Sequence, residues 1–192
     1  AKSGKKILFV ATKKQAKSIV AEAAKKLDMP YITERWPGGL LTNFSTIRKS
    51  IKKMDGIDKM KTDGTFDTLS KRERLQIDRT REKLEINLGS IVKMNRMPAA
   101  IFIIDINKEH IAVKESAKLG IRSFAVTDTN TNPSLVNYPI PGNDDASKAI
   151  SHIVDVVSKA ILEGISERSE EQDKKALEKQ KKAKKIAEEA KK

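Results

Sequence analysis

The sequence contains no cysteine and only two histidines among its 192 residues. The first absence excludes disulfide bonds, thiol nucleophiles and thiolate metal sites. His110 and His152 lie far apart on segments of helical pattern, so we expect them on helix surfaces and not in a catalytic or metal site. Aromatic residues make up only 4% of the chain, which leaves Ile, Leu, Val and Ala to build the core. No apolar run approaches the roughly 20 residues that a membrane-spanning helix needs.

Positive charge is in excess, with a formal net charge of +13. Residues 1–43 and 44–97 each carry +6, residues 98–164 carry −2, and residues 165–192 carry +3. A basic surface binds polyanions, because each Lys or Arg that neutralises a phosphate releases counterions. Nucleic acid is therefore the expected partner, and a surface that is basic only for solubility is the alternative. An anionic membrane is less suitable, because the chain lacks a basic helix with aromatic side chains.

Strand and helix patterns alternate in two parts of the chain. The apolar run from Ile7 to Ala11 is typical of a buried strand, and Thr12 is expected to cap the helix that follows it. Residues 30–33 are a short expected strand. The run AAIFIIDI, residues 99–106, is the clearest strand, and Asn107 is expected to cap the next helix. Strands near residues 121–127 and 138–141 and a long helix complete the pattern.

The middle of the chain has the pattern of two amphipathic helices. Apolar residues recur every three or four positions from Phe44 to Ile57, and a second stripe runs from Ile77 to Ile91. Ser70 and Glu73 have the spacing of a capping box at the start of the second helix. Two such helices joined by a polar turn predict an antiparallel hairpin with densely charged outer faces. The whole sequence therefore predicts a mostly parallel α/β layer fold with a helical hairpin inserted in its middle.

An enzyme would need a site at the carboxyl ends of the parallel strands, where such folds bind ligands. Asp105, Asp128, Asn130 and Asn132 fall there and are candidates to hold a ribose or a metal. The same residue types also cap helices and close turns, which is the simpler interpretation. Neither standard glycine-rich phosphate cradle occurs, and there is no nucleophile elbow or metal-ligand cluster.

The stretch RWPGGLLTNFSTIR, residues 35–48, places two glycines before a predicted helix start at Thr42 or Asn43. A phosphate cradle would place its glycines directly at the helix N-terminus. We therefore expect a turn after Pro37, with glycine supplying a positive φ. Trp36 could stack on a nucleic-acid base or pack against the sheet edge, and both alternatives stay open.

Several long motifs resemble one protein family. They are RWPGGLLTNFSTIRKSI, DGTFDTLSKRE, KLEINLGSI, FIIDINKEHIAVKESAKLGI and VTDTNTNPSLVNYPIPGNDDASKAI, and together they resemble bacterial-type small-ribosomal-subunit protein two from about Lys5 to Gly164. The resemblance implies a flavodoxin-like, mostly parallel sheet with helices on both faces and an inserted antiparallel coiled-coil hairpin. It also implies a structural, rRNA-binding protein of the cytoplasmic small ribosomal subunit, which contacts neighbouring proteins, including the large RNA-binding first protein of the subunit.

The chain differs from the family pattern in three places. The family has an additional N-terminal segment before the part that matches KKILFV, so we expect this chain to be a portion of a longer protein. Pro37 stands where the family commonly has an aliphatic residue, which stiffens the turn. The Lys/Glu/Ala-rich tail is not a family constant, so the resemblance implies nothing about it.

We therefore predict a non-catalytic small-subunit protein without cofactor or metal, that binds rRNA mainly through backbone phosphates and shape. A nucleotide-binding enzyme on a doubly wound scaffold, with Asp105 and Asp128 in its cleft, is the alternative. The expected organisation is an α/β domain of residues 1–42 and 98–164, a coiled-coil hairpin of residues 43–97, and a tail of residues 165–192 that is helical or disordered. The residues predicted to bind rRNA are Lys13, Lys14, Lys17, Arg35, Trp36, Arg48, Lys49, Lys52, Lys53, Arg72, Arg74, Arg79, Arg81, Lys93 and Arg96.

Overall fold

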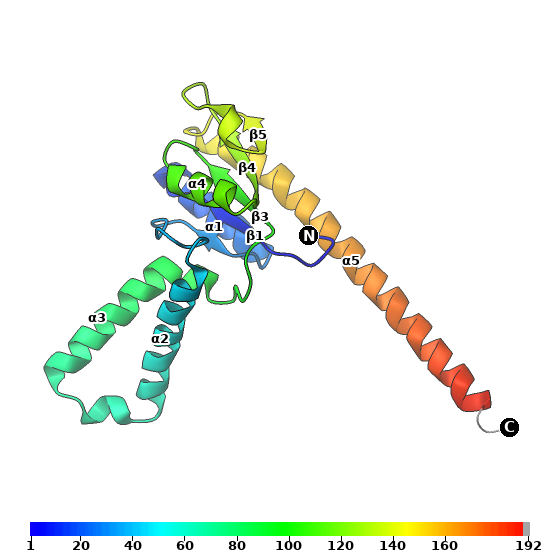
Figure 1. The fold of residues 1–192 in the computed structure, drawn as a ribbon, viewed down its shortest axis with the longest axis horizontal. Coiled ribbons are helices and arrows are strands. Elements are labelled where there is room, and N and C mark those ends of the chain that lie inside the picture. The colour runs from blue at the N-terminus through cyan, green and yellow to red at the C-terminus, as the bar shows by residue number, and fades with distance from the viewer. Residues whose placement is uncertain (190–192) are drawn as a thin grey trace.

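The fold is built on one five-stranded parallel sheet with the strand order β2-β1-β3-β4-β5 (Figure 1). The structure is a computed structural model that describes residues 1–189, and side chains as far as residue 171. The strands are β1 Ile7–Val10, β2 Tyr31–Ile32, β3 Ala100–Ile104, β4 Arg122–Thr127 and β5 Tyr138–Pro141. All four strand pairings are parallel, which confirms the predicted α/β class.

The central strand β3 is buried along its whole length, as its unbroken apolar sequence predicts. It pairs with β1 on one side, where Phe9 lies opposite Phe102, and with β4 on the other, where Phe102 lies opposite Phe124. Alternate residues of a strand point to opposite faces. The sheet therefore supports one hydrophobic core on each face.

Helix α1 (Lys14–Lys26) and the first part of α5 (Ser147–Glu189), as far as Ile165, cover one face of the sheet, and the rest of α5 extends beyond it (Figure 1). Phe9, Phe102, Val20 and Ile150 belong to the core on this side. The other face is covered by α4 (His110–Lys118), together with the segment from Trp36 to Leu41 and the base of the next two helices. Helices on both faces are the doubly wound arrangement that the alternating pattern predicts.

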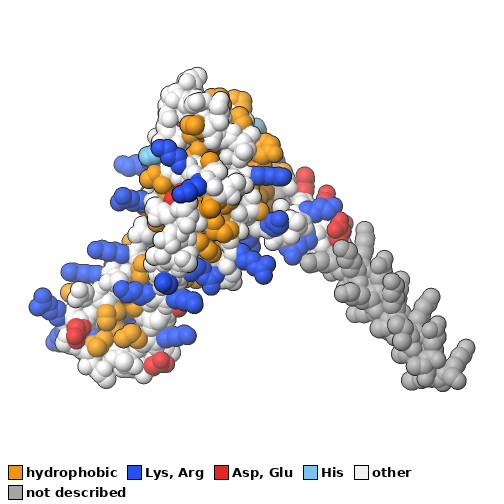
Figure 2. Space-filling model, viewed as in Figure 1, with side chains coloured by type: hydrophobic (Ala, Val, Ile, Leu, Met, Phe, Trp, Pro, Cys, Tyr) orange, Lys and Arg blue, Asp and Glu red, His pale blue; other side chains and the backbone are white. Residues whose placement is uncertain are grey.

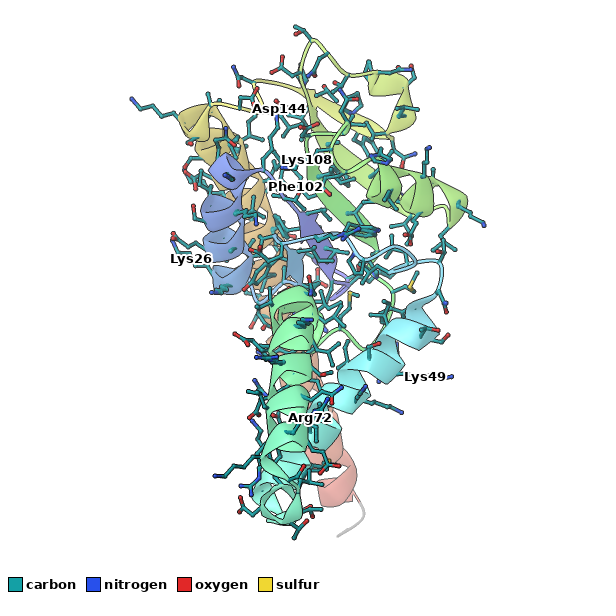
Figure 3. The ribbon with its side chains drawn as sticks, turned by 90° about the vertical axis from the view of Figure 1, so that its left-hand side faces the viewer. Lys26, Lys49, Arg72, Phe102, Lys108 and Asp144 are labelled. Atoms are coloured by element: carbon teal, nitrogen blue, oxygen red, sulfur yellow. The ribbon has the colours of Figure 1, made fainter. Side chains whose placement is uncertain are left out.

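Helices α2 (Phe44–Thr62) and α3 (Lys71–Leu88) extend away from the sheet and are joined by the short 3-10 helix Thr65–Thr68 (Figure 1). We call residues 44–88 the arm. The predicted capping box is confirmed, because Ser70 and Glu73 exchange side-chain and backbone hydrogen bonds. Figures 1 and 3 show that the two helix axes are inclined to one another. A groove of about 750 Å³, lined by Ile57, Met60 and Ile77 among others, separates their outer parts, so coiled-coil packing is not confirmed.

Two predicted helix caps are wrong. Helix α1 begins at Lys14 without a side-chain cap, and the backbone N–H of Thr12 instead donates to Glu109. Helix α4 begins at His110, because the chain first turns through Asp105, whose φ is 70° and whose carboxylate accepts the N–H of Lys108. The Asn107 side chain donates to the carbonyl of Asn130 instead.

The predicted tail continues α5, which runs from Ser147 as far as Glu189. Residues 190–192 lie outside the described part of the chain. Among the described helices, none has an apolar stretch long enough to cross a bilayer.

Candidate functional site

The loop that leads into α2 closes around the carboxylate of Glu115 on α4. Its Oε1 accepts hydrogen bonds from the Trp36 indole at 3.1 Å and from the Gly39 N–H at 2.7 Å. Its Oε2 accepts the N–H groups of Leu41 at 2.9 Å and Thr42 at 3.0 Å, and the Thr42 hydroxyl at 3.2 Å. Five donors therefore converge on one buried side chain.

These contacts set the charge state of Glu115. Burial by itself raises the pKa of this carboxyl, but the hydrogen bonds from Trp36, Thr42, Gly39 and Leu41 outweigh it and leave the pKa below its ordinary value. The ionised form is thus the one that the loop stabilises.

The predicted turn after Pro37 is confirmed. The N–H of Leu40 donates to the Pro37 carbonyl at 3.0 Å, and Gly39 has a φ of 84°. Three backbone N–H groups of the loop do face an anion, as in a phosphate cradle. The anion, however, is the protein's own Glu115, so Gly39 belongs to no free phosphate site and does more than turn the chain.

Trp36 is only 5% exposed and belongs to the core beneath α4. Its ring therefore packs inside the protein, which disfavours the predicted stacking on a base. The sequence alone left this choice open, because a Trp beside Pro and Gly suits either role.

The decisive partner, Glu115, was not predicted. Its signal was an acidic residue on the apolar face of α4, between Ala112 and Leu119 at helical spacing.

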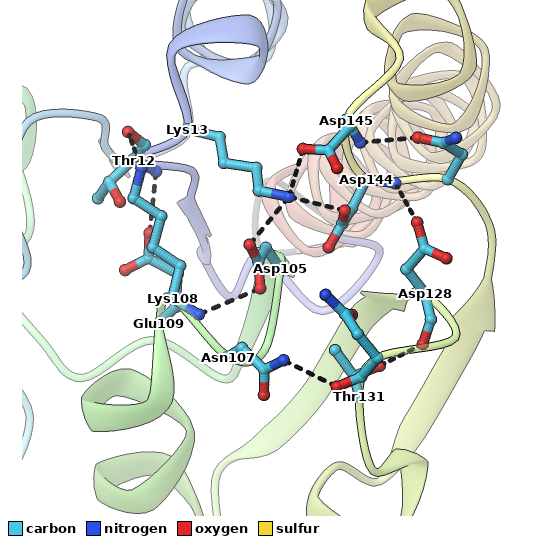
Figure 4. Close-up of polar contacts among 12 residues, drawn as sticks. Thr12, Lys13, Asp105, Asn107, Lys108, Glu109, Asp128, Thr131, Asp144 and Asp145 are labelled. Atoms are coloured by element: carbon cyan, nitrogen blue, oxygen red, sulfur yellow. Dashed lines mark hydrogen bonds and ion pairs between the residues drawn. The ribbon is translucent and has the colours of Figure 1, made fainter.

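Lys13 lies at the carboxyl edge of the sheet and is surrounded by carboxylates (Figure 4). Its Nζ is 3.0 Å from Asp105, 2.7 Å from Asp144 and 2.8 Å from Asp145. Burial opposes its charge, but these three partners prevail and raise the pKa of Lys13. Its ammonium group already has three anionic partners and its side chain is 14% exposed, which disfavours the predicted contact between Lys13 and rRNA.

The acidic residues that suggested an enzyme are used within the fold. Asp105 pairs with Lys13 and accepts the N–H of Lys108. Asp128 accepts the N–H groups of Thr129 and Asp144. Within the described residues, no group of three or more acidic or His side chains is arranged to hold a metal ion.

The arm carries most of the remaining predicted residues. Figure 2 shows Lys and Arg side chains along its visible face, and Figure 3 shows Lys49 pointing away from α2 and Arg72 near the far end of α3. Among the described residues, no hydrogen bond or ion pair engages the side chains of the exposed arm residues Lys49, Lys52, Lys53, Arg72 and Arg79, or of Lys14, Arg35 and Arg96 outside the arm.

Other predicted residues have partners inside the protein. Lys17 pairs with Glu34 at 2.7 Å, and Lys93 approaches Asp28 at 3.3 Å. Arg48 donates to the backbone and side-chain oxygens of Asn95, both at 3.0 Å. Arg74 donates to the carbonyls of Leu69 and Asp67, and Arg81 binds Asp58 through two nitrogens. The structure thus divides the predicted set into cations with partners inside the protein and cations that face solvent.

Comparison with known proteins places this architecture in a family. The family described as Ribosomal protein S2 matches residues 1–164. Small ribosomal subunit protein uS2 of Flavobacterium johnsoniae is 64% identical over 178 residues, which cover 93% of this chain and 70% of that protein. The protein of the same name from Christiangramia forsetii is 66% identical over 171 residues, which cover 89% of this chain and 57% of that protein. That from Porphyromonas gingivalis is 64% identical, with 89% and 61% covered.

The chain spans roughly three fifths of the length of most of these relatives. The matched family is one of ribosomal proteins and not of enzymes, which argues against the alternative of a nucleotide-binding enzyme. The family match covers both the parallel sheet and the arm, and the relatives share well over half of their aligned residues with this chain. The chain therefore belongs to the ribosomal protein S2 family.

Proposed function

We propose that this chain is a structural constituent of the cytoplasmic small ribosomal subunit and binds small-subunit rRNA through the basic side chains of the arm. The observation that supports this most directly is the set of exposed arm cations without a partner among the described residues. An unpaired surface cation keeps its full charge available for a phosphate.

Contacts to RNA phosphates and to RNA shape are expected to dominate over base readout. A-form helices hide their base edges in a deep, narrow groove, whereas their phosphates are exposed. The arm offers Lys and Arg side chains spread along two helices (Figure 2) and, within the described residues, no exposed aromatic cluster for stacking. Burial of Trp36 agrees with this interpretation.

In this proposal the inserted unit of residues 43–97, which includes the arm, carries the RNA contacts away from the α/β body of residues 1–42 and 98–164. The body's second part has a net charge of −2 and repels phosphates. Its surface is better suited to neighbouring ribosomal proteins, and we propose that it helps to anchor them, including the large RNA-binding first protein of the subunit. The names of the relatives support a small-subunit location.

A salt titration of rRNA binding tests the proposal. The triple variant Lys49→Glu, Lys52→Glu and Arg79→Glu should lose most of its affinity for small-subunit rRNA. It should also bind with a shallower dependence on salt, by about one unit of slope for each phosphate that the variant no longer neutralises. Lys148→Glu together with Lys159→Glu, on α5, is the control, and its effect is compared per reversed charge because it reverses two charges against three. Unchanged affinity and slope in the folded arm variant would show that the arm is not the RNA-binding face.

A further inference from the structure

The arm is joined to the α/β body at two places. One is the loop of residues 36–43, which leads into α2, and the other is the segment after α3, where Arg48 bonds to Asn95 and the hydroxyl of Ser90 donates to the carbonyl of Tyr31. The direction of the arm depends on how firmly each junction is held.

The first junction has no ordinary helix cap. Asn43 occupies the N-cap position of α2, but its side chain accepts hydroxyl hydrogen bonds from Ser45 and Thr46 and no backbone N–H. A helix N-terminus carries partial positive charge and free N–H groups, which favour a nearby anion. Glu115 supplies that anion, and its Oε2 binds the two residues directly before Asn43.

Glu115 belongs to the closely packed α/β body. It lies in the middle of α4, whose Ala112 and Val113 are packed in the core against the sheet. Both of its oxygens are engaged, by five donors, which is at least the capacity of a carboxylate. The loop therefore binds α4 through one side chain, since Trp36, Gly39, Leu41 and Thr42 all donate to Glu115.

From these contacts we propose that Glu115 is a positioning residue: it fills an anion-binding nest in loop 36–42 and thereby fixes the direction in which the arm leaves the body. The inference bears on the proposed function, because the arm carries the RNA-binding side chains. Its test, however, needs no RNA, so the two proposals fail separately.

The absence of native cysteine allows two spin labels to be placed without background. Labels on Lys59→Cys in α2 and Lys148→Cys in α5 report the distance between arm and body, because both residues are exposed and lie on separate parts of the fold. Pulsed electron paramagnetic resonance measures the distribution of this distance. The distribution should be about twofold broader in Glu115→Gln and Glu115→Ala than in the parent, because the loop can then open locally.

Glu109→Gln is the matched control, because Glu109 is also a buried glutamate near the start of α4 but binds Thr12 and not the loop. Acetate should narrow the distribution of Glu115→Ala again, because it replaces the missing carboxylate, whereas chloride at the same ionic strength should not. Gln has nearly the same shape as Glu. If Glu115→Ala does not fold, the distance distribution of Glu115→Gln alone therefore tests the proposal. A folded Glu115→Gln with the parent distribution, or a broadening shared by Glu109→Gln, would overturn the proposal.

Discussion

The indole Nε1 of Trp36 donates a hydrogen bond of 3.1 Å to Oε1 of Glu115, which lies 79 residues further along the chain. This contact joins the loop before the arm to the helix that covers the sheet. It also explains why a tryptophan stands in the loop: the ring packs in the core while its polar N–H has a buried acceptor. The loop is therefore organised by the protein itself, before any RNA is bound.

We predict that Glu115→Gln lowers the free energy of unfolding by about 3 kcal/mol, since charged hydrogen bonds are lost and the amide turns a donor towards N–H groups. Trp36 is the only tryptophan, so its fluorescence during urea unfolding reports the loop directly. Glu82→Gln, at an exposed carboxylate without a partner among the described residues, is the control and should be neutral. Equal stability of the two variants would contradict the role assigned to Glu115.

The stability of the protein should fall in acid partly through Glu115. Its pKa in the folded state lies below the ordinary value of 4.5, so its contribution is complete above that value and is lost as the pH falls through the folded pKa. Asp28 and Asp58, whose pKa values are lowered by hydrogen bonds from Lys6 and Arg81, act in the same direction. Urea unfolding at a series of pH values should therefore show a smaller loss below about pH 4.5 in Glu115→Gln than in the parent. Parallel curves would show that Glu115 does not contribute.

Glu109 should behave in the opposite way, although it lies next to the start of the same helix. Burial raises its pKa and prevails over the hydrogen bond from Thr12, so the folded state binds this proton more tightly than the unfolded state does. The stability that this provides is present at low pH and is lost as the pH rises from 4.5 through the folded pKa. Glu109→Gln should therefore gain stability relative to the parent as the pH rises above about 4.5. A relative loss over that interval would contradict the assignment.

The sequence predicted the sheet and the arm helices well because their signals are local. An unbroken apolar run marks β3, and the spacing of Ser70 and Glu73 marks the start of α3. The two mistaken caps show the limit of local signals. Thr12 and Asn107 have suitable side chains, but contacts with Glu109 and Asn130, distant in the sequence, determine what they do.

The candidate site was harder to predict because charge in a sequence does not show which cations are already paired. Lys13 and Lys14 are adjacent, yet one is held by three carboxylates and the other faces solvent. Trp36 was ambiguous for the same reason, since its partner lies on α4. Such pairings depend on how the parallel strands bring their carboxyl ends together, which only the complete topology reveals.

Lys13 and Lys14 therefore offer a direct comparison. Lys13→Met leaves Asp105 and Asp144 buried without a counterion and should lower the free energy of unfolding by about 3 kcal/mol. Its rRNA affinity per folded molecule and its salt slope should match those of the parent. Lys14→Met should change stability by less than about 0.5 kcal/mol and should weaken rRNA binding. Thermal unfolding and filter binding measure the two effects, and a folded Lys13→Met with a reduced salt slope would restore Lys13 to the RNA face.

Arg79 and Arg81 separate binding from arm stability within a single turn of α3. Arg81 reaches across to α2, where its Nε and Nη2 lie 2.5 and 3.2 Å from the two carboxylate oxygens of Asp58, whereas Arg79 is exposed and has no partner among the described residues. Arg79→Ala should weaken rRNA binding and lower its salt slope without changing the melting temperature. Arg81→Ala should cost about 0.5–1 kcal/mol of stability, as expected for a partly exposed ion pair.

The double-mutant cycle with Asp58→Asn decides whether that cost comes from the pair. If it does, the double variant should be no less stable than Arg81→Ala alone, because the interaction can be removed only once. Thermal unfolding supplies the stabilities, and rRNA binding over a range of salt concentrations supplies the slopes. If the losses of the two single variants instead add up in the double variant, the contribution of Arg81 to stability does not come from its pair with Asp58. A steeper loss of RNA affinity in Arg81→Ala than in Arg79→Ala, at equal arm stability, would show that the paired arginine and not the free one contacts the phosphates.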